Sequence, residues 1–199
     1  MKVYRVNIKD IEPNQLSAWF EQMDDKRKNA VNRMAIEQKR KLRTAADALC
    51  REAISDYCGI APDDIVFEYS EKGKPYAKGL PVYFNISHSG DYAVCAVSDC
   101  EIGIDIEKIK PFNIRAAEKF AADSEKKYIR SHQNGFFEIW TLKEAYFKCI
   151  GTGLGKDIKN VYFEVSQNGI ACSESGFECL FYEIDKDYIC SVCKKTAHK

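Results

Sequence analysis

Two carboxylates share one face of a short predicted strand. In the run Ile-Gly-Ile-Asp-Ile-Glu at residues 102–107, isoleucines alternate with Gly103, Asp105 and Glu107. Because successive side chains of a strand point to opposite faces, Asp105 and Glu107 project from the same face. Neighbouring carboxylates repel each other unless a cation lies between them, and a hard divalent ion such as Mg²⁺ meets that need. The pattern indicates a metal site, and the solvated edge of an amphipathic strand is the alternative.

A second charged group lies on a helix predicted at residues 137–150. Read at helical spacing, one stripe of this helix holds Trp140, Lys143, Glu144, Phe147 and Lys148. A plain surface helix separates its charges from its aromatic rings, whereas this stripe mixes them. The mixture indicates a functional site; the alternative is that both lysines extend from a core-facing stripe toward water.

Three further segments carry groups that could bind phosphate oxygens. One follows a predicted strand at 82–87, one is a glycine turn at 71–76, and the third is the basic run at 39–43. Turn amides, hydroxyls, imidazoles and ammonium groups can hold an anion. Each segment alone has an ordinary explanation as a capped turn, a charged hairpin or a solvated helix face. The candidate side chains are Ser87, His88, Lys72, Lys74 and Arg43.

Together these residues favour a pyrophosphate bound with a divalent metal. A serine hydrolase is disfavoured, because there is no Gly-x-Ser-x-Gly elbow and the adjacent Ser87 and His88 do not form a catalytic pair by adjacency alone. A Gly-x-x-x-x-Gly-Lys phosphate loop is also missing from the sequence.

The bulk composition narrows the class of protein. With 199 residues, 45% of them hydrophobic, the chain can bury a core as one domain or two small ones. Thirty basic residues balance thirty acidic ones, so no overall field attracts nucleic acid or an anionic membrane. The N-terminus lacks the apolar core of a signal peptide, and no apolar run reaches membrane-spanning length. We expect a soluble cytoplasmic protein with no nucleic-acid or membrane partner.

The nine cysteines do not read as a disulfide framework, because their number is odd and they are scattered through apolar segments. We expect most of them to be reduced core residues. Cys190 and Cys193 lie three apart in a predicted strand, which sends their sulfurs to opposite faces and disfavours a redox or zinc pair.

The elements that must position the candidate residues run from helices to strands, twice over. The expected helices cover 14–23, 26–34, 37–57, 113–121, 124–131 and 137–150. The expected strands cover 1–8, 65–69, 82–87, 92–97, 101–106, 160–166, 179–184 and 188–194.

A short internal repeat accompanies this order. Gly-Asp-Tyr-Ala-Val-Cys-Ala-Val at 90–97 parallels Lys-Asp-Tyr-Ile-Cys-Ser-Val-Cys at 186–193. A duplicated α+β unit is the economical interpretation, with halves at 1–100 and 101–199 and a ligand cleft between them.

The combined motifs closely resemble the Sfp-type 4′-phosphopantetheinyl transferase family, within the holo-[acyl-carrier-protein] synthase superfamily. The resemblance rests on the Gly-Ile-Asp strand at 103–105, Trp-x-x-Lys-Glu-Ala-x-x-Lys at 140–148, Phe-Asn-Ile-Ser-His-Ser-Gly at 84–90 and Gly-Lys-Pro at 73–75. It runs from the Arg43 helix to Gly153, whereas the last quarter of the chain matches only in its strand-like pattern of residues and carries no family motif.

The resemblance implies an α+β fold of two similar halves related by a pseudo-twofold axis, active as a monomer. It implies transfer of the phosphopantetheine arm of coenzyme A to a serine of an apo acyl or peptidyl carrier protein, with release of adenosine 3′,5′-bisphosphate. It further implies Mg²⁺, or Mn²⁺ in its place, on Asp105, Glu107 and Glu144, with Lys148 and Glu144 as catalytic groups. The implied coenzyme A contacts are Arg43, Lys72, Lys74, Ser87, His88, Lys143 and Lys148.

Two other functions fit the same residues. One is a Mg²⁺-dependent nucleotide-pyrophosphate hydrolase, which would use water in place of the serine. The other is a non-catalytic module that binds coenzyme A or a carrier protein, and the presence of all three acids disfavours it.

Overall fold

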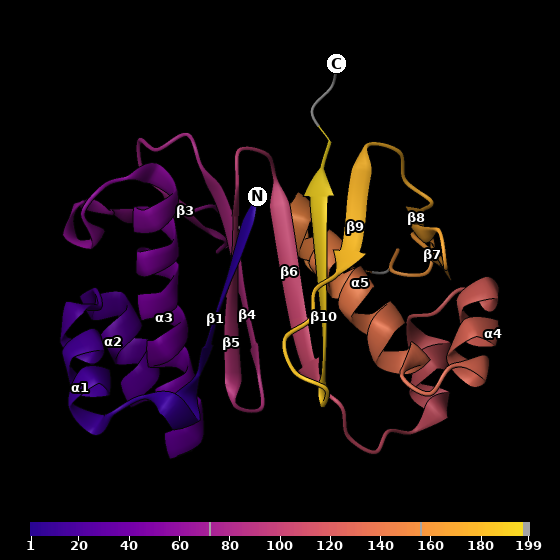
Figure 1. Cartoon of the computed structure of the whole chain (residues 1–199), viewed down its shortest axis with the longest axis horizontal. Coiled ribbons are helices and arrows are strands. Elements are labelled where there is room, and N and C mark those ends of the chain that lie inside the picture. The colour runs from indigo at the N-terminus through magenta and orange to yellow at the C-terminus, as the bar shows by residue number, and fades with distance from the viewer. Residues whose placement is uncertain (72, 156, 197–199) are drawn as a thin grey trace.

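The computed structural model describes residues 1–71, 73–155 and 157–196 and shows two α+β halves side by side (Figure 1). Helices lie at the outer side of each half, and strands meet in the middle. The N-terminal half contains β1 (Lys2–Asn7), the 3₁₀ turn η1 (Ile8–Asp10), α1 (Pro13–Gln22), α2 (Asp25–Asn32), α3 (Glu37–Cys58), η2 (Pro62–Asp64), β2 (Phe67–Tyr69), β3 (Pro75–Ala77), β4 (Tyr83–Ser89) and β5 (Tyr92–Ser98). The C-terminal half contains β6 (Ile102–Lys108), η3 (Ile114–Lys119), α4 (Asp123–Ser131), α5 (Gly135–Ile150), β7 (Phe163–Ser166), β8 (Gly169–Cys172), β9 (Phe177–Phe181) and β10 (Tyr188–Lys195).

The two halves repeat one topology. The first sheet has the strand order β1-β5-β4, and the second has β6-β10-β9-β8-β7. In each half the first strand pairs antiparallel with the last, which pairs in turn with the strand before it. A small hairpin is inserted in both, as β2–β3 and as β7–β8. The prediction of two similar α+β halves is therefore confirmed.

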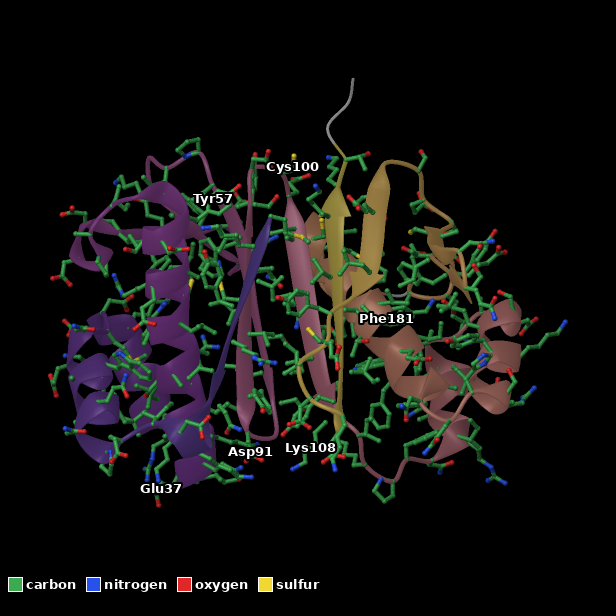
Figure 2. The ribbon with its side chains drawn as sticks, viewed as in Figure 1. Glu37, Tyr57, Asp91, Cys100, Lys108 and Phe181 are labelled. Carbon is green, nitrogen blue, oxygen red and sulfur yellow. A yellow bond between two sulfur atoms is a disulfide. The ribbon has the colours of Figure 1, made fainter. Side chains whose placement is uncertain are left out.

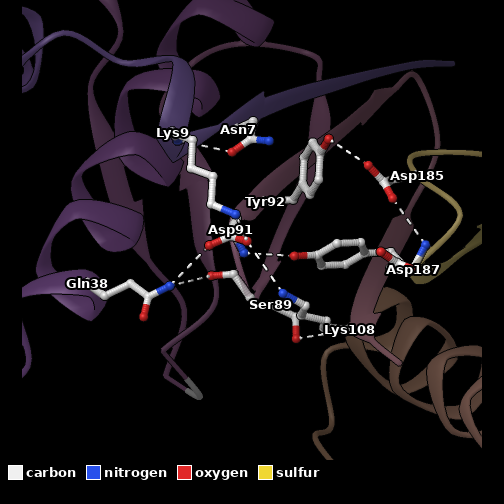
Figure 3. A network of polar contacts seen from close by, with 11 residues as sticks. Asn7, Lys9, Gln38, Ser89, Asp91, Tyr92, Lys108, Asp185 and Asp187 are labelled. Atoms are coloured by element: carbon white, nitrogen blue, oxygen red, sulfur yellow. Dashed lines mark hydrogen bonds and ion pairs between the residues drawn. The ribbon is translucent and has the colours of Figure 1, made fainter. Parts of the chain in front are cut away.

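The internal repeat of the sequence maps onto this topology. β5 begins at Tyr92 and β10 at Tyr188, which are the tyrosines of the two matching segments. The two rings pack edge to face, with their centroids 4.9 Å apart. Tyr92 donates a hydrogen bond to Asp185, and the Tyr188 hydroxyl accepts one from the backbone N–H of Asp91 (Figure 3). The two tyrosines thus contact each other and the opposite half at the junction, as equivalent residues near a pseudo-twofold axis do.

Each half covers its sheet with one long helix. α3 packs against β5, β1 and β4, and α5 packs against β6 and β10. The buried side of α3 carries apolar residues at helical spacing, including Leu42, Ala46, Leu49 and Ala53. Both helices end at a glycine in the left-handed region, Gly59 (φ 69°) and Gly151 (φ 70°), where a side chain would be strained.

The halves also share part of their core. Val94 and Ala96 of β5 pack with Ile104 of β6 and Val192 of β10 in one buried cluster. Side chains fill the space between the central strands; Asp91 and Lys108 lie at one end of them and Cys100 at the opposite end (Figure 2). No described helix has both the length and the apolar character needed to cross a bilayer.

Several element boundaries differ from those expected. β4 continues to Ser89, so His88 and Ser89 lie inside the strand and not in the turn after it. The expected helix at 113–121 is the 3₁₀ segment η3, and the short strands β3 and β8 were not predicted. β3 and β8 have only three and four residues and show no alternation in the sequence, whereas the equally short β2 and β7 lie within longer apolar runs.

One cysteine pair also differs. Cys179 and Cys193 stand opposite each other on β9 and β10 and form a disulfide, which the sequence did not predict. Cys190 is buried in the core shared by the halves, while Cys193 belongs to the core under α5, so the predicted opposite orientation is confirmed. The remaining cysteines are free: Cys50, Cys58, Cys95, Cys100, Cys149, Cys172 and Cys190.

Candidate active site

Asp105 lies at the centre of the site, buried where β6 meets both β4 and α5. Its Oδ1 atom is 2.5 Å from Nζ of Lys148 and accepts a hydrogen bond of 2.8 Å from the Ser87 hydroxyl. Lys148 Nζ also donates to Ser87 Oγ at 3.0 Å and to the Ile104 carbonyl at 3.3 Å. Burial raises the pKa of Asp105, and Lys148 and Ser87 oppose that rise. The site thus joins residues of both halves.

Gly103 explains how α5 comes so close to this strand. A Cβ atom at Gly103 would collide with the backbone of Ala145 and of Cys149 on the helix. With no side chain there, the helix backbone rests directly on β6. Glu144 and Lys148 are thereby brought beside Asp105.

Glu107 and Glu144 complete the acidic group that the sequence predicted. Glu107 is half-buried and accepts a hydrogen bond of 2.9 Å from the Ser89 hydroxyl. Burial raises the pKa of Glu144, and the Asp105 and Glu107 carboxylates raise it further, while Lys148 lowers it. The three carboxylates therefore repel one another electrostatically, which is the condition that a cation relieves.

The donor atoms fit a hard divalent ion. Oδ2 of Asp105 is buried and has no hydrogen-bond partner, so it is available as a ligand, and carboxylate oxygens are the ligands that Mg²⁺ prefers. Within residues 1–71, 73–155 and 157–196, however, no three His, Cys, Asp or Glu side chains converge closely enough to enclose an ion. The Lys148 ammonium group, and not a further carboxylate, lies against Oδ1 of Asp105.

Lys143 faces away from the group, contrary to the sequence interpretation. It is fully buried, 2.8 Å from the equally buried Glu125 at the start of α4. Its Nζ also donates to the Ile158 carbonyl at 2.9 Å and to that of Val161. All three donors are used inside the C-terminal half, so this position does not bring Lys143 to a ligand in the cleft. The pair with Glu125 was not foreseen from the sequence.

Ser87 and His88 point to opposite sides of β4, because they are successive residues of a strand. The Ser87 hydroxyl faces β6 and is already bonded to Asp105 and Lys148. His88 instead lines a hollow of about 650 Å³ together with Arg43, Ser89 and Gly90. The predicted anion contacts are thus divided between the junction of the two halves, where Ser87 lies, and this neighbouring hollow, where His88 lies.

Lys74 connects the hairpin of the N-terminal half to the end of α5. Its Nζ donates to the carbonyls of Lys148 at 2.7 Å and Cys149 at 3.1 Å. A cation at this end of a helix compensates the negative end of the helix dipole. Lys74 and Cys149 also line a groove of about 510 Å³ between the halves. Lys72, a further predicted contact, lies outside the described residues.

Asn85 and Ser89 lie beside the site on β4 and were not named as candidates from the sequence. Together with Ser87 they occupy alternate positions of β4 and accept hydrogen bonds from β6. The signal was present as the polar residues Asn85, Ser87 and Ser89 at every second position of Phe-Asn-Ile-Ser-His-Ser.

Known proteins match both halves of the chain. The profile described as "4'-phosphopantetheinyl transferase, N-terminal" matches residues 11–100, and that of the 4'-phosphopantetheinyl transferase superfamily matches 101–193. The 4'-phosphopantetheinyl transferase psf-1 of Bacillus pumilus is 30% identical over 98% of this chain and 90% of its own length. The chain belongs to the 4′-phosphopantetheinyl transferase family. As a member of this family it is a transferase enzyme.

Other family members and solved structures match less of the chain. A 4'-phosphopantetheinyl transferase of Bacillus subtilis is 37% identical over 74% of this chain and 70% of its own. The holo-[acyl-carrier-protein] synthase of Thermotoga maritima aligns with 50% of this chain and 65% of its own, with a TM-score of 0.44 and 22% identity. That of Helicobacter pylori, solved with coenzyme A, aligns with 48% of this chain and 99% of its own, with a TM-score of 0.40 and 21% identity.

Proposed function

We propose that this phosphopantetheinyl transferase moves the phosphopantetheine arm of coenzyme A to a serine of an apo acyl or peptidyl carrier protein, with Mg²⁺ as cofactor. The observation that supports this most is the joining of Asp105, Glu144 and Lys148 where the halves meet. The buried Asp105 with Lys148 against it, together with the nearby half-buried acids Glu107 and Glu144, suits a pyrophosphate bound together with a divalent ion.

The reaction breaks one bond and forms one. The serine oxygen attacks the β-phosphorus of coenzyme A, and the bond from that phosphorus to the bridging oxygen breaks, so adenosine 3′,5′-bisphosphate leaves. Phosphoryl transfer depends mainly on alignment and charge neutralisation. A divalent ion held by Asp105, Glu107 and Glu144 would supply neutralisation of the pyrophosphate charge.

The side chains of the chain itself have three tasks. Lys148 offsets negative charge on the oxygens of the transferring group. Glu144, half-buried beside Asp105, accepts the serine proton directly or through a water molecule. Arg43 and His88, which line the adjacent hollow, bind the phosphate groups of the nucleotide end.

The test is intact-mass analysis of an apo carrier protein incubated with the enzyme, coenzyme A and Mg²⁺. We expect a gain of one phosphopantetheine, lost with a chelator and in Glu144→Gln, and kept in Glu164→Gln, which alters an exposed acid on β7. No gain with acyl or peptidyl carriers would overturn the proposal. Cleavage of coenzyme A without transfer would favour the pyrophosphate hydrolase, and binding without either reaction would favour the non-catalytic module.

A further inference from the structure

β4 and β6 lie side by side without sharing a sheet. β4 is the edge strand of the first sheet and β6 the edge strand of the second. They nevertheless pack closely together at the junction of the halves. The backbone N–H groups of β6 on this side therefore need partners other than a neighbouring backbone.

Side chains of β4 supply these partners at a regular interval. Asn85 Oδ1 accepts from the N–H of Ile104 at 3.0 Å. Ser87 Oγ accepts from Ile106 at 3.4 Å, and Ser89 Oγ accepts from Lys108 at 3.1 Å. We call these three β4 residues the polar seam. Each step of two residues on one strand matches a step of two on the other, so the polar seam fixes the register of the halves.

The two serines of the polar seam also hold the acids. Ser87 donates to Asp105 at 2.8 Å, and Ser89 donates to Glu107 at 2.9 Å. Each serine hydroxyl therefore donates a hydrogen bond to an acid of β6 and accepts one from the backbone N–H of the residue after that acid. Asn85 has no such acid, because the residue at the corresponding place on β6 is Gly103.

We propose that Ser87 and Ser89 are positioning residues that aim the Asp105 and Glu107 carboxylates at the metal, while Asn85 only fixes the register. The positioning role rests on the proposed Mg²⁺-dependent function, because that function supplies the metal. The role of the polar seam in fixing the register does not depend on it. Hydrogen-bonded partners of metal-binding carboxylates change metal affinity by about 10- to 100-fold when they are removed.

Ser89 gives the cleaner experiment, because Ser87 is also bonded to Lys148. Three variants are compared with the unaltered protein: Ser89→Ala, Ser89→Thr, which keeps the hydroxyl, and Asn85→Ala, which removes one hydrogen bond between β4 and β6 without touching an acid. Binding of Mn²⁺ alone is followed by the electron paramagnetic resonance of the free ion, and backbone N–H exchange is followed by NMR. Thermal unfolding checks that each variant is folded.

We expect Ser89→Ala to weaken Mn²⁺ binding about tenfold or more and to speed exchange at Lys108, with Ser89→Thr restoring both. Asn85→Ala should speed exchange at Ile104 and leave Mn²⁺ affinity unchanged. Steady-state kinetics with varied Mn²⁺ should show the same ranking, with the Ser89→Ala defect reduced at high ion concentration.

The readouts separate this proposal from the proposed function. Unchanged Mn²⁺ affinity in Ser89→Ala, or equal weakening in Asn85→Ala, would overturn the positioning role. If the unaltered protein bound no Mn²⁺, the metal requirement of the proposed function would fail together with the positioning role. Unchanged exchange at Lys108 in Ser89→Ala would refute the polar seam itself, whatever the enzyme does.

Discussion

Lys148 is the residue on which most interactions of the site converge. It contacts Asp105, Ser87 and the Ile104 carbonyl, and it comes from α5, which packs against β6. Its charge is paired with the Asp105 carboxylate. Binding of a cation to Asp105 would free the ammonium group for the substrate phosphates.

We expect Lys148→Ala to lower kcat about 100-fold or more, because in the proposed mechanism this charge stabilises the transferring phosphoryl group. KM for coenzyme A should change much less. Steady-state kinetics on an apo carrier measures both values, with Lys110→Ala on an exposed site as the control. A kcat within a factor of two of the unaltered enzyme would contradict this role.

A second prediction at this scale concerns Cys149, which lines the groove beside Lys74. Burial raises the pKa of its thiol to about 11, although Lys74 acts in the opposite direction. Only the thiolate reacts with iodoacetamide, so alkylation of native Cys149 should be slow at pH 8 and accelerate toward pH 11. Peptide mass analysis measures the rate, and rapid alkylation at pH 8 in the native but not the Cys149→Ser protein would contradict it.

Helix α5 is held from two sides, by β6 and by the start of α4. On the β6 side, the contact depends on the missing side chain of Gly103. We expect Gly103→Ala to destabilise the protein by about 1–3 kcal/mol or more, because the helix backbone must move away. Urea unfolding measures the change, and Gly155→Ala, where a Cβ meets nothing, is the matched control. Equal stability of both variants would refute the close approach.

On the other side, α5 is held by the Lys143–Glu125 pair. Because both side chains are fully buried, Lys143→Met should cost about 3–5 kcal/mol by leaving a buried carboxylate unpaired. Adding Glu125→Gln should recover part of that loss, since the amide oxygen can still accept from Phe163 N–H. A double-mutant cycle measures the coupling. Additive losses would mean that the two side chains do not interact.

The difference between Lys143 and Glu144 shows what an element-level pattern can and cannot predict. Successive residues of a helix lie about 100° apart, so a stripe wide enough to hold both cannot place both in one site. Strand alternation was more informative: it placed Asp105 and Glu107 on one face without ambiguity. The sequence could not show that Ser87 bonds Asp105, because that contact depends on how two separate sheets meet.

At the scale of the whole molecule, the halves are similar but not independent. The core cluster of Val94, Ile104 and Val192 belongs to both, and Asp91 is contacted by Lys9, Lys108 and Gln38 from both sides of the junction (Figure 3). The repeated order of helices and strands was visible in the sequence and correctly predicted two halves. Their shared core was not, because apolar strands read alike whether they face a helix or another sheet.

We therefore expect both halves to unfold in one cooperative transition. Trp19 lies in α1 and Trp140 in α5, so each half carries its own fluorescent reporter. Trp19→Phe and Trp140→Phe variants should give the same urea midpoint by fluorescence as by circular dichroism, each compared on the same protein. Two separated midpoints would show that the shared core does not couple the halves.

The polar seam has a consequence for self-association. An edge strand with unpaired backbone groups is a template for another chain, and natural proteins cover or interrupt such edges. Here the inner edges of both sheets cover each other, with side chains in place of a continuous backbone ladder. If the halves separated, the unpaired backbone edges of β4 and β6 would both be exposed. Loss of the polar seam should therefore promote aggregation in addition to lowering activity.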